Sequence, residues 1–141
     1  MVDRAATAKE MYRVLRSKGR FVGAVWAGPK LCDLVRFQQI AGSYSDAPPV
    51  PGVGPGALAD PTEFLQQLSD VGFTVHVETE NLGFDIDSFA LTWDVFAGVT
   101  TARLSPDFKQ KAREAVMAEM WPDGEGPRHF NNGTQFITGS K

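Results

Sequence analysis

Apolar residues near the start of the chain recur at the spacing of one helix face, with charged residues between them. The apolar positions of this face are Ala8, Met11, Val14 and Leu15. Gly19 follows, and a glycine just past the last turn can take the left-handed conformation that closes a helix. The run Phe21–Trp26 is then apolar without alternation, which is typical of a strand covered on both faces. The pattern therefore predicts a helix, a glycine stop and an interior strand.

Helical spacing returns between positions 29 and 40, where the apolar residues are Leu31, Leu34, Val35 and Phe37. The segment from Pro48 to Gly56 is too rich in proline and glycine to form a regular element, so we expect a loop. Asp60 and Pro61 predict a third helix, because an acid at the N-cap and a proline at the first helical position are both favoured. Gly72 is predicted to end this helix, whose buried face would contain Phe64, Leu65, Leu68 and Val71.

Valine alternates with polar residues from Thr74 to Glu80, which predicts a strand with one wet face or an exposed edge. Asp87 or Ser88 is expected to cap a fourth helix, and Ser105 a fifth. The predicted inward residues of these two helices are Phe89, Trp93, Phe96, Ala97, Phe108, Ala112, Ala115, Val116 and Met120. The pair Asn132–Gly133 indicates a turn, after which the segment 134–138 is expected to return into the sheet as the final strand.

The composition limits the class of protein. With 141 residues, of which 43% are hydrophobic and 22% charged, the chain is expected to form one domain over residues 1–141. A net charge of −3 gives no electrostatic reason to expect a nucleic-acid partner. The longest apolar run, from Phe21 to Ala27, is too short to span a bilayer, and Met1 to Ala8 has no hydrophobic signal core. We therefore expect neither a membrane nor an export signal.

Cysteine and histidine are scarce in this chain. Cys32 is the single cysteine, which excludes an internal disulfide and favours the reducing cytoplasm. His76 and His129 alone do not make a spaced ligand set for structural zinc, so we assign no metal-binding residue. Near the start of a predicted helix Cys32 could have a lowered thiol pKa, but burial as a small apolar group is the commoner interpretation.

Several stretches together resemble a known family. They are Glu10–Arg16 with Gly19–Val22, then Leu58–Pro61 before a helix that ends Val71–Phe73, and finally Ile137–Lys141. In order and spacing they are similar to the C-terminal part of class I S-adenosylmethionine-dependent methyltransferases, in the small-molecule branch that includes the ubiquinone- and menaquinone-biosynthesis enzymes. The resemblance covers nearly the whole chain. It implies an α/β chain with a partial class I methyltransferase fold, in which about five helices accompany about three strands and the last strand lies antiparallel in the middle.

The same resemblance implies methyl transfer from S-adenosylmethionine to a small organic acceptor. The cofactor site of such a fold needs a glycine-rich turn between a strand and a helix, and an acid after the next strand. The segment Gly52–Gly56 has a similar glycine spacing, but it follows a proline run and leads into no helix cap, so we expect a surface loop. Because no other segment qualifies, we expect no S-adenosylmethionine binding by this chain alone, which would be inactive or dependent on a separate N-terminal half.

A partial sheet of this kind would leave the Phe21–Trp26 strand without one neighbour. An unpaired apolar edge is a template for another chain. We therefore expect a homodimer, or a complex with a separate N-terminal half, through the Phe21–Trp26 edge or the first helix. The alternatives to a truncated or split methyltransferase are a non-enzymatic homodimeric binding module for an apolar small ligand, and an inert remnant that association stabilises.

Methyl transfer depends mainly on alignment of the reacting groups, so no catalytic residue is required by the resemblance and none is assigned. The resemblance points to an acceptor pocket with the candidate residues Trp26, Phe37, Phe84, Phe89, Trp93 and Phe96, each of which could equally be core. His76 is expected to be a solvated residue of its strand, and His129 remains unassigned. Asp87 is better explained as a helix cap than as one half of a carboxylate pair, and Asp85 as its solvated neighbour.

Overall fold

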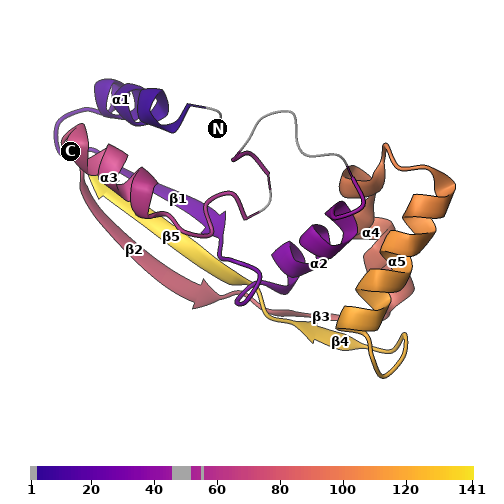
Figure 1. Cartoon of the computed structure of the whole chain (residues 1–141). Helices are drawn as coiled ribbons and strands as arrows, with labels where there is room; N and C mark the ends of the chain where they lie inside the picture. Colours follow the sequence, from indigo (N-terminus) through magenta and orange to yellow (C-terminus); the bar gives the residue numbers. More distant parts are fainter. Residues whose placement is uncertain (1–2, 46–51, 55) are drawn as a thin grey trace.

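The computed structural model describes residues 3–45, 52–54 and 56–141. Within these residues the chain is mixed α/β, with five helices and five strands (Figure 1). In chain order the elements are α1 (Arg4–Val14), β1 (Arg20–Trp26), α2 (Asp33–Gly42), α3 (Thr62–Asp70), β2 (Thr74–Asn81), β3 (Phe84–Ile86), α4 (Phe89–Thr101), α5 (Pro106–Met120), β4 (Arg128–Phe130) and β5 (Gly133–Ser140). No helix in the described part of the chain is long and apolar enough to cross a bilayer.

Three strands form the main sheet in the order β1-β5-β2. The last strand, β5, runs antiparallel to both neighbours, so that Thr138 lies opposite Val22 on one side and His76 on the other. Strands β1 and β2 are therefore parallel to each other. The prediction that the last strand lies antiparallel in the middle of three is confirmed, as is the number of helices in the described residues.

A second, two-stranded sheet continues the first. Strands β3 and β4 pair antiparallel, with Asp85 opposite His129. The Leu82 N–H donates to the Asn132 carbonyl at 3.0 Å in the short connection between the two sheets. The β2–β5 pair thus runs on into the β3–β4 pair as one long ribbon (Figure 1). About three strands were predicted, and the described residues form five: β3 and β4 were not predicted, because three-residue strands carry too little alternation to be recognised.

Helices α1 and α3 cover one face of the main sheet (Figure 1). The core between them and the sheet is built from Ala8, Phe64, Leu68, Phe73 and Ile137. Helix α3 ends as predicted at Gly72, which has φ +108°. The Gly72 N–H donates to the Ser69 carbonyl and the Phe73 N–H to the Leu68 carbonyl, which is the paired bonding of a glycine C-cap. This cap turns the chain directly from α3 into β2.

Helices α2, α4 and α5 form a second core against the far end of the ribbon. Its buried members are Phe37, Ala41, Ile86, Phe89, Ala97, Val116, Met120, Trp121 and Phe130. Ser88 and Ser105 cap α4 and α5 as expected, because the Ser88 hydroxyl accepts from Leu91 N–H and the Ser105 hydroxyl from Phe108 N–H. The two cores lie at opposite ends of the ribbon (Figure 1).

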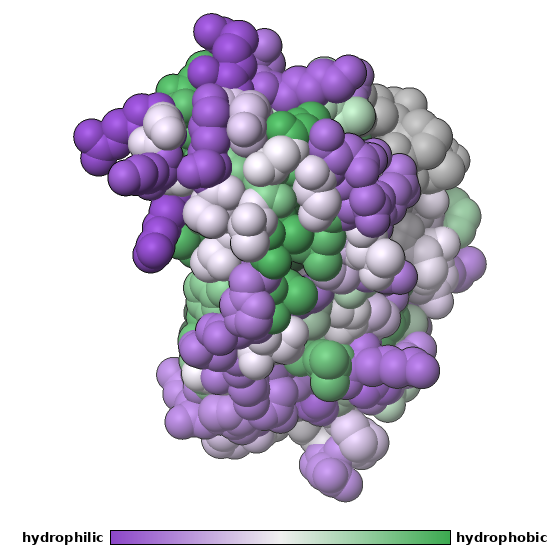
Figure 2. Space-filling view, turned by 90° about the vertical axis from the view of Figure 1, so that its left-hand side faces the viewer, coloured by the Kyte–Doolittle hydropathy of each residue, from purple (hydrophilic) through white to green (hydrophobic). Residues whose placement is uncertain are grey.

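Strand β1 departs from its prediction as an interior strand. Its residues alternate between partly covered and exposed positions, and Val22 and Trp26 are 69% and 40% exposed. The helices cover one face only, and among the described residues β1 pairs with β5 alone. The view onto the end of the molecule that carries α1 and α3 also shows apolar groups at the surface between hydrophilic ones (Figure 2). The continuous apolar run therefore marks a strand that the described chain leaves half covered.

Other expectations about single residues need correction. Val14 and Phe108 were expected on the buried faces of their helices but are exposed, since Val14 ends α1 and Phe108 lies in the first turn of α5. Leu31 was expected within the second helix, but α2 begins only at Asp33 and Leu31 is exposed before it. The left-handed conformation predicted for Gly19 is taken by Lys18, with φ +62°. Glycine is still required at position 19, because a Cβ there would lie 2.7 Å from the Arg16 carbonyl oxygen.

Two capping and turn predictions are also shifted. Helix α3 begins at Thr62, one residue later than predicted, while the Asp60 carboxylate accepts hydrogen bonds from the Thr62 N–H and hydroxyl. Asn132–Gly133 is not a hairpin turn: Gly133 opens β5, and Asn132 is fully buried in a bridge with Cys32. The predicted proline-rich loop lies partly outside the described residues, which exclude 46–51 and Pro55.

Candidate functional site

Five of the six predicted pocket residues gather in the second core. The ring centroids of Phe37 lie 6.0 Å from Trp93 and 6.2 Å from Phe96, and Phe89 lies 6.2 Å from Trp93. Phe84 completes the group at 6.4 Å from Phe96, with 40% of its own surface exposed. Phe37 and Phe89 are fully buried. The structure therefore places these five residues in a packed aromatic cluster, where their main contribution is to stability.

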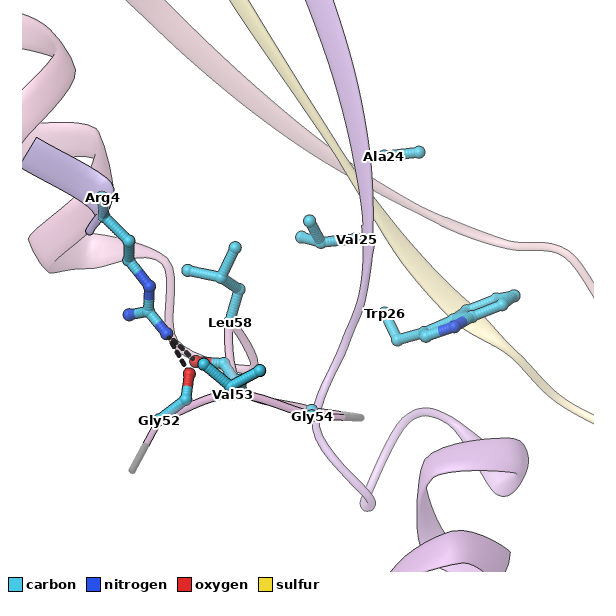
Figure 3. Close-up of a pocket in the computed structure, with 10 residues that line it drawn as sticks. Arg4, Ala24, Val25, Trp26, Gly52, Val53, Gly54 and Leu58 are labelled. Carbon is cyan, nitrogen blue, oxygen red and sulfur yellow. Dashed lines mark hydrogen bonds between the residues drawn. The ribbon is translucent and has the colours of Figure 1, made fainter. Parts of the chain in front are cut away.

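Trp26, the sixth candidate, lies apart at the end of β1. It contributes to a cleft of about 250 Å³, which we call the glycine-loop cleft and which is lined by Arg4, Ala24, Val25, Trp26, Gly52, Val53, Gly54, Gly56, Ala57 and Leu58. Val25 and Leu58 face each other across this cleft, whereas the side chains of Ala24 and Trp26 point to the other face of β1 (Figure 3). Trp26 thus borders the cleft mainly with its backbone.

The glycine segment is held by one arginine. The Arg4 Nη2 donates to the Gly52 carbonyl at 2.8 Å and to the Ala57 carbonyl at 2.9 Å (Figure 3). Gly52, Gly54 and Gly56 all have positive φ, so the backbone needs glycine at each position. The Gly52 and Ala57 carbonyl groups accept hydrogen bonds from Arg4 on α1. The next helix, α3, begins only at Thr62, several residues after the loop. A cofactor loop presents N–H groups at a helix start, an arrangement that the described residues here do not provide.

A larger cleft lies where β1 and β2 end. It has a volume of about 440 Å³, and we call it the strand-end cleft; it is lined by Lys30, Leu31, Asp33, Thr79, Glu80, Asn81, Asn131 and Gly133. Because β1 and β2 are parallel, this cleft lies at the carboxyl ends of both strands. The crevice at such strand ends is the usual ligand position in α/β sheets.

Hydrogen bonds fix the polar wall of the strand-end cleft. Asp33, the first residue of α2, accepts from the Asn131 N–H at 2.8 Å and lies 3.5 Å from the Arg128 Nη2. The Asn81 Nδ2 donates to the Asn131 Oδ1 at 2.8 Å. The Lys30 ammonium and the Glu80 carboxylate are the other charged groups of the lining. The cleft therefore combines a positioned amide pair with charges of both signs.

Asn132 supports this wall from behind. It is fully buried, its Oδ1 accepts from the Leu34 N–H at 3.1 Å, and its own N–H donates to the Asn81 Oδ1 at 2.8 Å. The Cys32 thiol donates to the same Oδ1 at 3.5 Å. Sequence analysis read Asn132 as a turn residue, and no local pattern could have shown that it ties α2 to the ribbon.

Cys32 is buried, as the commoner interpretation of a lone cysteine predicts. It is 1% exposed, and burial raises the pKa of its thiol above the ordinary value. Hydrogen bonds from the backbone of α2 oppose this effect but are the smaller influence. The thiol is therefore a packing group and not an activated nucleophile.

Both histidines lie beside a carboxylate on the ribbon. The His76 Nε2 lies 3.1 Å from the Glu78 Oε1 on β2, and the His129 Nδ1 lies 2.7 Å from the Asp85 Oδ1 across β3 and β4. Sequence analysis left His129 unassigned and regarded Asp85 as a solvated neighbour of the cap. The register of β3 against β4 brings them together, and that register was not predicted. Among the residues that the structure describes, no three histidine, cysteine or acidic side chains are arranged to hold a metal ion.

Comparison with known proteins gives no assignment, since no protein-family model and no curated protein matches this chain. Three features of the described residues bear on function: the strand order β1-β5-β2, the edge of β1 that pairs with no described strand, and the strand-end cleft.

Proposed function

We propose that this chain is the C-terminal part of a class I S-adenosylmethionine-dependent methyltransferase, which binds a small organic acceptor and depends on a separate nucleotide-binding half for the methyl donor. The observation that carries the proposal is the strand order β1-β5-β2 with the last strand antiparallel in the middle. The resemblance of the Glu10–Val22 and Ile137–Lys141 segments implies the same order. The buried free thiol of Cys32 suits a protein of the reducing cytoplasm.

The uncovered face of the main sheet favours a separate nucleotide-binding half, which would cover it. Strand β1 presents exposed Val22, Ala24 and Trp26 on the face opposite α1 and α3. A parallel strand beside β1, with helices behind it, would bond the free edge and bury this face. In the proposed enzyme that strand belongs to the nucleotide-binding half, and β1 becomes the interior strand that its composition indicates.

The strand-end cleft is the proposed acceptor site. It lies at the carboxyl ends of β1 and β2, where a ligand would face the neighbouring half of the sheet. Its lining carries hydrogen-bonding groups from three segments that are far apart in the chain. Such convergence of polar groups favours a small polar or amphipathic molecule.

We expect the methyl donor to bind outside this chain, because the described residues of the glycine-loop cleft lack the N–H groups at a helix start that such a donor site needs. In the glycine-loop cleft the carbonyl groups of Gly52 and Ala57 are bound by Arg4, and no helix starts directly behind the loop. The donor site is therefore assigned to the other half of the proposed enzyme, and this chain to acceptor binding.

Titration calorimetry tests the proposal. S-adenosylhomocysteine is titrated into two samples. The first is the 141-residue chain alone. The second is the chain co-expressed with its proposed nucleotide-binding half, a polypeptide with a glycine-rich strand and helix that is encoded upstream or in a neighbouring gene. We expect binding to the combined protein and none to the chain alone. Tight binding to the chain alone, or no binding to the combined protein, would contradict the proposal.

The alternative is a homodimeric module that binds an apolar small ligand. The observation that favours it is the same free β1 edge, because two copies could pair antiparallel through their β1 strands. Light scattering distinguishes the two functions. A stable homodimer that does not bind the nucleotide-binding half supports the binding module. A chain that is monodisperse only in complex with that half supports the methyltransferase.

A further inference from the structure

The strand register assigns each side chain of the main sheet to one of its two faces. Val22 on β1 lies opposite Thr138 on β5, which lies opposite His76 on β2. Side chains alternate between the faces, so this same face carries the row of Ala24, Phe136 and Glu78 and the row of Trp26, Thr134 and Glu80. The alternate residues pack with α1 and α3; they include Phe21, Val25, Val75, Val77 and Ile137. We call the side that carries Val22 and Trp26 the open face, because the first core covers only the other one.

Apolar and acidic residues are separated on the open face. Its residues on β1 are Val22, Ala24 and Trp26, all of them exposed, and Ala24 and Trp26 point away from the glycine-loop cleft (Figure 3). Its residues on the second half of β2 are Glu78 and Glu80, which are exposed as well. Phe136 lies between the two groups and is partly covered. The open face is therefore apolar along β1 and acidic along β2.

The dimensions of the open face match those of one helix. Three strands about 4.8 Å apart span about 10 Å, which is close to the diameter of an α-helix with its side chains. The 7 residues of β1 and the 8 residues of β5 extend over about 25 Å. A helix rises about 1.5 Å per residue, so about 16 residues would cover this length.

A groove on the main sheet offers a place for an anchoring side chain. It has a volume of about 300 Å³ and crosses the three strands where β1 and β2 begin. Most of its lining residues belong to the open face by register: Arg20, Val22, Thr74, His76, Thr138 and Ser140. The groove thus lies beside the apolar row of β1, at the end of the open face away from Glu80.

A second copy of the chain is a poor occupant of the open face. In a face-to-face pair of aligned sheets, a two-fold axis along the strands sets β1 of one copy against β2 of the other, and hence apolar residues against Glu78 and Glu80. A two-fold axis across the strands sets these two carboxylates against the same carboxylates of the other copy. Both arrangements bury acidic groups without an opposite charge, which is costly.

We propose that the open face is the docking surface for one amphipathic helix of the nucleotide-binding half. The apolar stripe of this helix covers β1 and β5, and the flank over β2 carries lysine or arginine opposite Glu78 and Glu80. A helix is the usual cover on each face of a sheet that contains parallel strands, as α1 and α3 are on the other face. The inference rests on the proposed function for the origin of the helix, while the open face itself determines its length and charge.

The test uses two stapled synthetic helices of about 16 residues, which share one leucine stripe and carry either lysine or glutamate along one flank. Each is titrated into the full chain and followed by the NMR shifts of backbone amides. We expect the lysine helix to shift amides of β1, β5 and β2 and to bind about fivefold more tightly than the glutamate helix, as two exposed ion pairs allow. No shift on these strands with either helix, or equal affinities, would overturn the proposal.

A matched pair of double variants separates a local effect from net charge. Glu78→Lys with Glu80→Lys should reverse the preference between the two helices. Glu114→Lys with Asp123→Lys makes the same change in net charge at exposed positions on and after α5, and should preserve the preference. An equal effect of both double variants would show that only the net charge matters and would overturn the proposal.

The apolar stripe has its own readout. Val22→Asn should weaken the binding of both helices about tenfold, whereas Val99→Asn on α4 should leave it unchanged. A homodimer that protects the open face and excludes both helices would identify a second copy as the occupant and would contradict the proposal. Neither helix carries a methyl donor, so these results do not depend on the calorimetry with S-adenosylhomocysteine, and each test can fail without the other.

Discussion

At the scale of single residues, Asn132 illustrates how one buried side chain joins distant segments. Its Oδ1 accepts from the Leu34 N–H at the start of α2, while its N–H donates to Asn81 at the end of β2. Local sequence could indicate only that an asparagine before glycine favours a turn. The bonding partners lie about 50 and 100 positions away in the chain, beyond the reach of any local pattern.

Replacing the fully buried Asn132 by alanine should lower the free energy of unfolding by about 1–3 kcal/mol, because the part-buried Leu34 N–H loses its acceptor. The exposed neighbour Asn131 provides the control, and Asn131→Ala should cost less than about 1 kcal/mol. Urea denaturation followed by circular dichroism measures both values. Equal losses of stability in the two variants would show that the Asn132 hydrogen bonds contribute no more than those of an exposed asparagine.

Cys32 gives a pH-dependent prediction. Burial raises its folded-state pKa above 9.0, so the folded chain keeps the neutral thiol at a pH where the unfolded chain ionises. The contribution of Cys32 to stability is therefore complete below the ordinary thiol pKa and is lost as the pH rises through the folded-state value. We expect urea midpoints to fall at alkaline pH less in Cys32→Ala than in the wild type. An identical alkaline slope in both proteins would contradict the assignment.

At the scale of elements, the end of α3 at Gly72 could be predicted from sequence, because a glycine that follows an amphipathic helical pattern is a local signal.

Gly72→Ala should destabilise the chain by about 1–3 kcal/mol, since the backbone has φ +108° and a Cβ would lie 3.0 Å from the Tyr12 ring. Gly98→Ala in α4 should instead stabilise by about 0.5–1 kcal/mol, because nothing lies within 4 Å of its Cβ. Thermal unfolding of both variants compares them, and shifts of the same sign would refute this explanation.

The strands show where local patterns are insufficient. The alternation of Val75 and Val77 with polar residues identified β2 and its wet face correctly. The apolar run Phe21–Trp26 predicted β1 but not its exposed face. The composition of a strand indicates how much burial would suit it, but not which neighbouring elements are present to bury it. Strands β3 and β4 have three residues each and depend on their pairing, so the Asp85–His129 contact could not be predicted.

At the scale of the whole molecule, the strand order followed from the family resemblance and not from periodicity. The aromatic residues illustrate the corresponding limit: spacing placed Phe89, Trp93 and Phe96 on one face of a helix, but spacing cannot distinguish a packed core from the wall of a pocket. The strand-end cleft was not predicted at all, since its polar lining converges from loops and strand ends.

The free edge of β1 should make the chain associate with itself when no second half is present. Val22→Lys places a charge on the exposed side of this edge and should weaken self-association roughly tenfold. The control is Val99→Lys on α4, where the native valine is 93% exposed and remote from the sheet edge. Sedimentation over a range of concentrations measures association, and an equal effect of both substitutions would show that general solubility is responsible.

Amide hydrogen exchange along β1, followed by NMR together with light scattering, is the most direct test that this sheet is incomplete. Alternate amides of Arg20–Trp26 bond to β5, and the others point away from it. The account predicts that the outward amides exchange rapidly in the dilute monomer and become protected when a second chain pairs with β1. Slow exchange of those same amides in a monomer would show that the edge is already covered and would contradict the account.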